Sequence, residues 1–274
     1  MAWTATRLNP AAVMSLTAAL ISLLQQESLD ARDAGDGTLH VSSGQGLRKR
    51  EAKVDWRSLE AALADVHDEH EREADVHSWA RGVAAVLTEP RNNKAPALME
   101  FAEAAKSIMP QVERSTFALG ARAAGGEAHT MPFGADLHLA FYVELDDGFR
   151  LLSREQVIRW GATDDRIERA AFSILYHRSR HTELSPAALT GVDEWTSGDG
   201  FDGARALILD AVDWFRCGAG ARFAAPSQHL LLVTTDATSP DDAVFESMVE
   251  EHFRSAERPL SRRVFRFVGG RRTV

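Results

Sequence analysis

The chain has 274 residues, 45% of them hydrophobic, and a formal net charge of −9. This length predicts one large domain or two small ones with a well-buried core. The single cysteine, Cys217, excludes an intramolecular disulfide and favours a reducing, cytoplasmic location. No apolar run reaches about 18 residues, so no membrane helix is predicted. The net acidity argues against a general nucleic-acid binder and leaves only a local basic patch for that function.

The N-terminal segment is predicted to be an amphipathic helix over residues 11–24. Pro10 suits a first helical turn, and Val13, Leu16 and Leu20 recur at helical spacing. We expect this helix either to pack against the rest of the chain or to bind a partner. A signal peptide is the alternative, and the lack of a small-residue cleavage site after the segment argues against it.

Three regions are expected along the chain: residues 1–34 as the N-terminal helix and a polar linker, residues 35–111 as a mainly helical region, and residues 112–274 as an α+β domain. In the middle region a strand is expected over 38–41. Residues 55–87 form a long helical segment whose apolar face changes partway, which predicts two helices or one bent helix. A further helix is expected over 97–107.

The last region alternates strands with helices. Residues 137–145 are apolar on both faces, and Asp146-Asp147-Gly148 predicts a hairpin turn with a strand returning to Leu152. Ser153 and Gln156 form a capping box that starts a short helix. Strands are also expected at 116–119, 230–235 and 262–268, helices at 164–178, 203–216 and 239–255, and a loop at 120–126. The fold class is therefore α+β, with a mixed or antiparallel sheet packed with helices in the C-terminal half and a mostly helical N-terminal part.

Three stretches of the second half carry a family resemblance, namely 139–146 with the helix that follows, 198–205, and 225–233 with the helix after it. Their order and spacing over about residues 112–270 resemble the YtpQ-like family of uncharacterised bacterial proteins. The resemblance implies a shared fold and transfers no active site. Gln228 departs from the acidic residue that the family pattern has there.

A histidine- and acid-rich helix face is the strongest candidate for a metal site. His67, His70, Glu71 and His77 fall on about a third of the helix circumference, and imidazole and carboxylate groups together bind transition metals. The spacing differs from the His-Glu-x-x-His motif, so alternating charge on a solvated helix is the competing interpretation. No cofactor is otherwise expected.

Two further polar groups are weaker candidates for a functional site. Asp136 and His138 share one face of the main strand, near His129, and such a pair can act as acid and base; a polar pair at a strand edge is the simpler interpretation. Asp199 and Asp202 carry carboxylates of the kind that bind calcium, but they lack the spacing of a calcium loop.

Basic residues gather at the C-terminus, where residues 251–274 hold seven Arg against two Glu. Arg258, Arg262, Arg263 and Arg266 are the candidate docking residues there, together with the N-terminal Val13, Leu16 and Leu20. Four interpretations remain open: an acidic protein partner, a nucleic acid contacted by the Arg-rich strand, ion pairs with the acidic segment 60–73 of the same chain, and an edge strand protected by its charge.

These features predict a cytoplasmic, non-catalytic adaptor or accessory protein that binds another protein, with no membrane association. The first alternative is a metal-dependent hydrolase that uses the histidine-rich helix face. The second alternative is a nucleic-acid-binding protein. The sequence leaves the oligomeric state open.

Overall fold

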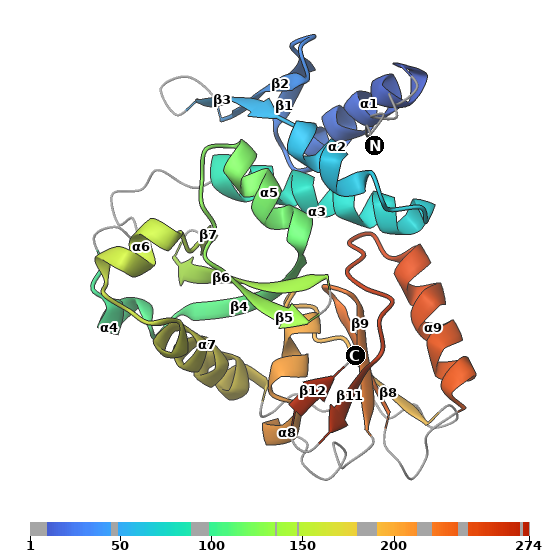
Figure 1. Ribbon diagram of the computed structural model, residues 1–274. Coiled ribbons are helices and arrows are strands. Elements are labelled where there is room, and N and C mark those ends of the chain that lie inside the picture. The colour runs from blue at the N-terminus through green and yellow to red at the C-terminus, as the bar shows by residue number, and fades with distance from the viewer. Residues whose placement is uncertain are drawn as a thin grey trace, which may run out of the picture.

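The computed structural model describes residues 10–44, 49–88, 99–134, 136–146, 148–179, 191–212, 221–234, 241–268 and 271–273. The expected α+β class is confirmed: helices pack on three sheets within these ranges, and every strand pair in them is antiparallel. No helix in this part of the chain is both long and apolar enough to span a membrane. Figure 1 shows the arrangement of the elements.

The N-terminal part joins helix α1 (Pro10–Gln26) to a sheet of β1 (Asp30–Asp33), β2 (Thr38–Ser43) and β3 (Arg50–Asp55), in that order. The expectation of a mostly helical part is therefore too simple. Strand β1 has the sequence Asp-Ala-Arg-Asp, in which only Ala31 is buried, so no alternating apolar pattern marks it. The antiparallel pairing with β2 holds residues 30–33 as a strand, although their own sequence does not predict one.

Two helices follow, α2 (Arg57–Leu63) and α3 (Glu69–Leu87), as the change of apolar face predicted. Asp68 begins α3, because its side chain accepts a hydrogen bond from the Glu71 N–H at 3.0 Å. One hydrophobic cluster unites α1, the first sheet and α3, and it includes Leu20, Leu24, Leu39 and Trp79. The expected helix over 97–107 is reduced to α4 (Phe101–Ala104) within the described residues.

The central sheet is built on the predicted long strand, β6 (Leu137–Leu145), and its hairpin partner β7 (Gly148–Leu151). Strands β4 (Ile108–Arg114) and β5 (Thr130–Gly134) also pair with β6. Helices α3 and α5 (Ser115–Ala123) lie over one face of this sheet, and α7 (Asp164–Ser179) lies on the other (Figure 1). The expected regional boundary between 111 and 112 falls inside β4.

Helix α5 replaces the strand expected at 116–119 and much of the loop expected at 120–126, so both predictions were wrong. The reason lies in the crossing of α3 and α5. A Cβ on Gly120 would come within 2.0 Å of the Trp79 carbonyl oxygen, and one on Gly82 within 2.0 Å of the Phe117 carbonyl oxygen. Gly120 therefore serves close helix packing and does not break the helix.

The C-terminal part forms a second large sheet in the order β12 (Arg271–Thr273), β11 (Phe265–Val268), β9 (Arg222–Ser227), β10 (Leu230–Thr234), β8 (Val192–Trp195). Helix α9 (Asp242–Ser255) packs on it through Phe245 and Val249. The helix expected over 203–216 is a 3-10 turn, Gly203–Leu207, followed by α8 (Leu209–Val212); residues 213–216 lie outside the described ranges. Helix α6 (Arg154–Arg159) begins at the predicted cap, since Ser153 accepts from the Gln156 N–H at 3.2 Å.

Candidate ligand-binding site

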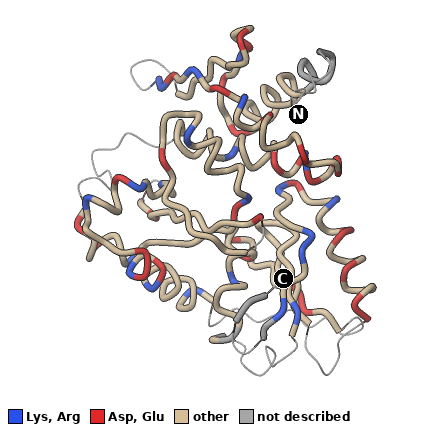
Figure 2. The backbone as a smooth tube through the Cα atoms, in the orientation of Figure 1, with Lys and Arg blue, Asp and Glu red and all other residues tan. Residues whose placement is uncertain are grey.

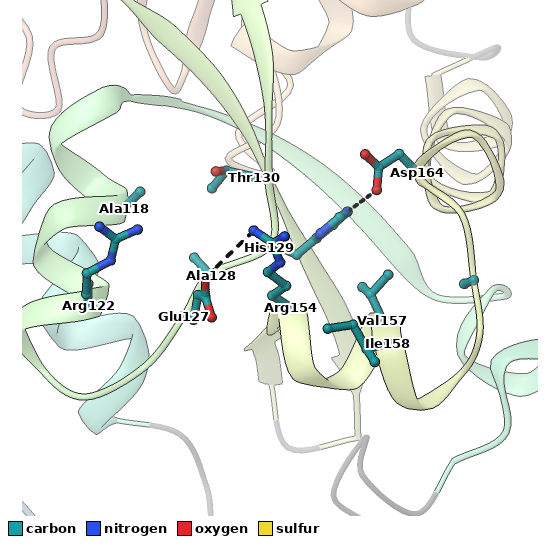
Figure 3. Close-up of a pocket in the computed structure, with 11 residues that line it drawn as sticks. Ala118, Arg122, Glu127, Ala128, His129, Thr130, Arg154, Val157, Ile158 and Asp164 are labelled. Carbon is teal, nitrogen blue, oxygen red and sulfur yellow. Dashed lines mark ion pairs between the residues drawn. The ribbon is translucent and has the colours of Figure 1, made fainter.

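A pocket of about 370 Å³ opens between α5, the segment that leads into β5, α6 and the start of α7 (Figure 3). Its volume falls in the range typical of small-ligand sites, about 300–1,000 Å³. The lining side chains come from these four elements and are Ala118, Arg122, Glu127, Ala128, His129, Thr130, Arg154, Val157, Ile158, Ala162 and Asp164.

Backbone hydrogen bonds fix the floor of the pocket. The His129 N–H donates to the Leu152 carbonyl at 2.8 Å, and the Arg154 N–H donates to the Glu127 carbonyl at 2.9 Å. Residues 127–129 are thus tied to the segment that begins α6. Ser153 caps α6 and so fixes where this helix begins, which helps to position the α6 side chains that line the pocket.

His129 is the buried polar group of the pocket, with 7% of its surface exposed. Its ring packs 5.6 Å from the ring of Phe141, centroid to centroid. Its Nε2 atom is buried without a hydrogen-bond partner in the described structure, and the nearest carboxylate oxygen, Oδ1 of Asp164, is 3.6 Å away. Burial lowers the pKa of His129; Asp164 opposes this shift and Arg154 adds to it.

Two guanidinium groups border the pocket. Arg154 is largely exposed, and its Nη1 lies 3.8 Å from Oε1 of Glu127, which makes a loose ion pair. Arg122 is exposed on α5, and its side chain has no hydrogen-bond or ion-pair partner among the residues that the structure describes. Val157 and Ile158 supply an apolar wall, and Ile158 is 69% exposed. Such a site offers planar donors for an oxyanion beside a surface for a small apolar group.

The four expected metal ligands do not converge. His70 and His77 lie on α3 with Glu73 between them, at 4.0 and 3.9 Å, and both border a groove of about 200 Å³ beside α9. Glu71 instead binds Arg114 at 2.6 Å, and His67 is exposed ahead of the helix. In the described ranges, no group of three or more His, Cys, Asp or Glu side chains is placed to hold a metal ion.

Two of the three expected N-terminal docking residues pack against the hydrophobic core of the chain. Leu20 is fully buried in the core shared by α1 and α3, and Leu16 is half-buried against the same cluster. Val13 lies in α1, but its side chain is outside the described part of the structure. Helix α1 is therefore packed on the chain through at least Leu20, and a partner would have to use its remaining surface.

Most of the expected C-terminal arginines make ion pairs within the chain. Arg258 lies 3.4 Å from Glu27, Arg266 lies 2.9 Å from Asp242, and Arg262 reaches two carboxylates of the acidic segment 60–73. The distances for Arg262 are 3.1 Å to Asp68 and 2.9 Å to Glu71, so the predicted intramolecular match is confirmed for this residue.

Figure 2 shows the charges behind these pairs: acidic residues recur along α9, and basic residues lie on the neighbouring C-terminal segment. The side chain of Arg263 is exposed, and in the described structure it has no ion pair. It is therefore the one expected docking arginine whose charge is not matched by a carboxylate in the described ranges.

Sequence reasoning missed the pocket. It singled out His129 only as a polar residue near the main strand, and it gave Arg122 and Arg154 no role. These residues come from separate elements, and Arg122 lies in the segment that was expected to be a loop. The one local signal was the cap formed by Ser153 and Gln156, which positions α6 but says nothing of its neighbours.

No protein-family model, no curated protein and no solved structure was found to match this chain. The resemblance to the YtpQ-like family therefore stays a prediction.

Proposed function

We propose that this protein is a binding protein that holds a small anionic ligand in the pocket between α5 and α6. The observation that carries the proposal is the guanidinium of Arg122, which lines the pocket with no partner in the described structure. Carboxylate and phosphate-type oxyanions match the donor geometry of a guanidinium better than any other common ligand group.

The rest of the pocket supports the same ligand class. Arg154 is held only loosely by Glu127, so a second guanidinium can turn to the ligand at small cost. The Thr130 side chain lines the pocket and supplies a hydroxyl, and Val157 with Ile158 covers the carbon skeleton of an organic anion. We therefore expect a ligand that combines a carboxylate or phosphate group with a short apolar part.

Titration calorimetry on the full chain tests this proposal with a panel of sulfate, phosphate, citrate and short-chain carboxylates. The variant Arg122→Gln keeps a polar side chain and removes the charge, so its affinity should fall by about ten- to a hundredfold, the usual worth of a charge-assisted hydrogen bond. Arg169→Gln is the matched control, because Arg169 is an exposed arginine of α7 outside the pocket. Equal affinities for Arg122→Gln and the unchanged protein, or no binding of any panel anion, would refute the proposal.

Docking of another protein is the second candidate function, and Arg263 favours it, since its exposed charge has no carboxylate partner in the described ranges. An acidic protein surface is the partner that fits such a charge. Crosslinking in the native host, followed by mass spectrometry, should give a companion that is lost with Arg263→Glu and kept with Arg169→Glu. A companion set that is the same for both variants would contradict this candidate.

A further inference from the structure

We propose that anion binding in the α5–α6 pocket is coupled to protonation of His129, so that the ligand and one proton bind together. This inference rests on the proposed function and adds the group that regulates it. His129 would then act as the residue that sets the charge of the pocket.

The charge balance of the lining gives the first argument. Arg122 on α5 and Arg154 on α6 bring two positive charges, while Glu127 before β5 and Asp164 on α7 bring two negative charges. Strand β6 also packs on the imidazole, with the uncharged ring of Phe141. With His129 neutral the charges of the lining cancel, and with His129 protonated the pocket is positive. The protonation state of one side chain therefore decides the sign of the field that an anion meets.

The placement of the ring gives the second argument. Nε2 of His129 is buried and has no hydrogen-bond partner in the described structure. Protonation there creates a buried positive charge, so it needs a nearby negative charge to offset the cost of burial. Asp164, 3.6 Å away, already supplies part of this compensation. An anion bound beside Arg154 would supply the rest, because it offsets the positive charge that now disfavours the imidazolium.

The direction of the pH dependence follows from these contacts. Burial holds the pKa of His129 below its ordinary value of 6.5 in the free protein, and a bound anion raises it. At a pH above the His129 pKa of both the free protein and the complex, the affinity for the anion is constant. As the pH falls through the His129 pKa of the complex, the affinity for the anion rises, and it levels off below the His129 pKa of the free protein.

Calorimetry with sulfate as the probe tests the inference, because sulfate keeps its charge across the range from about pH 8 to about pH 5.5. We expect sulfate to bind about tenfold more tightly at the lower pH, as is typical of coupled sites. His129→Gln should bind with the same affinity at both pH values. His177→Gln is the matched control, since it removes an exposed histidine of α7 outside the pocket and should keep the full pH dependence.

The titration of the His129 ring protons by NMR, with and without sulfate, gives a readout on the unchanged protein if His129→Gln does not fold. A midpoint raised by sulfate supports the coupling, and an unmoved midpoint overturns it. Sulfate binding that needs Arg122 but is equal at both pH values overturns the coupling and leaves the proposed function standing. No sulfate binding at either pH overturns the coupling and counts against the proposed function as well.

Discussion

The guanidinium of Arg205 is almost fully buried, and each of its nitrogen atoms has a hydrogen-bond acceptor within the chain. Its Nη2 lies 2.6 Å from Asp199, its Nη1 lies 2.8 Å from Asp202, and its Nε donates to the Ser179 hydroxyl at 2.9 Å. The two carboxylates that resemble calcium ligands in the sequence thus face a fixed positive charge of the same segment. A buried arginine with every edge bonded stabilises the loop that it closes.

The carboxylate of Asp199 should therefore contribute to stability in a pH-dependent way. Burial alone would raise its pKa, but hydrogen bonds from Arg205 and from the Phe201 N–H outweigh this and hold the pKa at about 2, below the ordinary 3.8. A lowered pKa gives stability that is present above pH 3.8 and is lost as the pH falls toward 2. We expect Asp199→Asn to lower the free energy of unfolding by about 1–2 kcal/mol near neutral pH, after allowance for partial exposure.

Urea unfolding at about pH 6 and about pH 2.5 measures this effect. The difference between the variant and the unchanged protein should shrink at the lower pH, because a pH of about 2.5 lies between the folded-state pKa of about 2 and the ordinary 3.8, where much of this stability is lost. Asp65→Asn, at an exposed position before α3, is the control and should be neutral at both pH values. A difference for Asp199→Asn that is equal at both pH values would contradict the electrostatic explanation.

At the scale of elements, the crossing of α3 and α5 depends on two glycines. Each one faces a backbone carbonyl of the other helix, Gly82 that of Phe117 and Gly120 that of Trp79. Helices approach this closely only where a side chain is missing from the contact. Because Arg122 follows Gly120 on the same helix, the crossing also sets one wall of the pocket.

A methyl group at this crossing should be costly, because the atoms it meets belong to the backbone and cannot rotate away. We expect Gly82→Ala and Gly120→Ala each to lower the free energy of unfolding by about 3 kcal/mol or more. Gly126→Ala is the graded control, since its Cβ would meet mainly the Val86 side chain, at 2.6 Å, and the nearest backbone atom, the Ala121 carbonyl oxygen, lies at 3.5 Å. Chemical denaturation compares the three variants, and equal losses would show that the backbone contact is not what matters.

At the scale of the whole molecule, Arg114 connects three parts of the chain. From the end of β4 it binds Asp75 of α3 at 2.8 Å and Asp136 ahead of β6 at 3.1 Å, and it donates to the Leu260 carbonyl of the C-terminal segment at 2.6 Å. Next to it, Arg262 ties the same C-terminal segment to the start of α3. Burial alone would lower the pKa of Arg114, but the hydrogen bond and charge of Asp75 and the other carboxylates outweigh it and raise the pKa, so the guanidinium stays charged.

Loss of the Arg114 side chain should strongly lower the free energy of unfolding. Arg114→Ala leaves buried carboxylates without their counter-charge, so we expect a loss of about 3–5 kcal/mol in the free energy of unfolding. Arg254→Ala removes an exposed pair with Glu250 on α9 and should cost about 0.5 kcal/mol or less. Urea unfolding of both variants at neutral pH checks the contrast, and similar losses would contradict it.

The sequence by itself determined the α+β class, the strand over 137–145 with its hairpin, and the helix cap at Ser153, because periodicity, turn residues and caps act over a few neighbouring residues. Only the tertiary structure decided that 115–123 is helical, that α1 carries a buried Leu20, and that Arg262 meets Asp68 and Glu71. The same holds for the pocket, whose charged side chains come from separate elements. The physical reason is that close approach, burial and ion pairing depend on which surfaces of the folded chain meet. The local sequence around a residue does not show which distant residue it will contact.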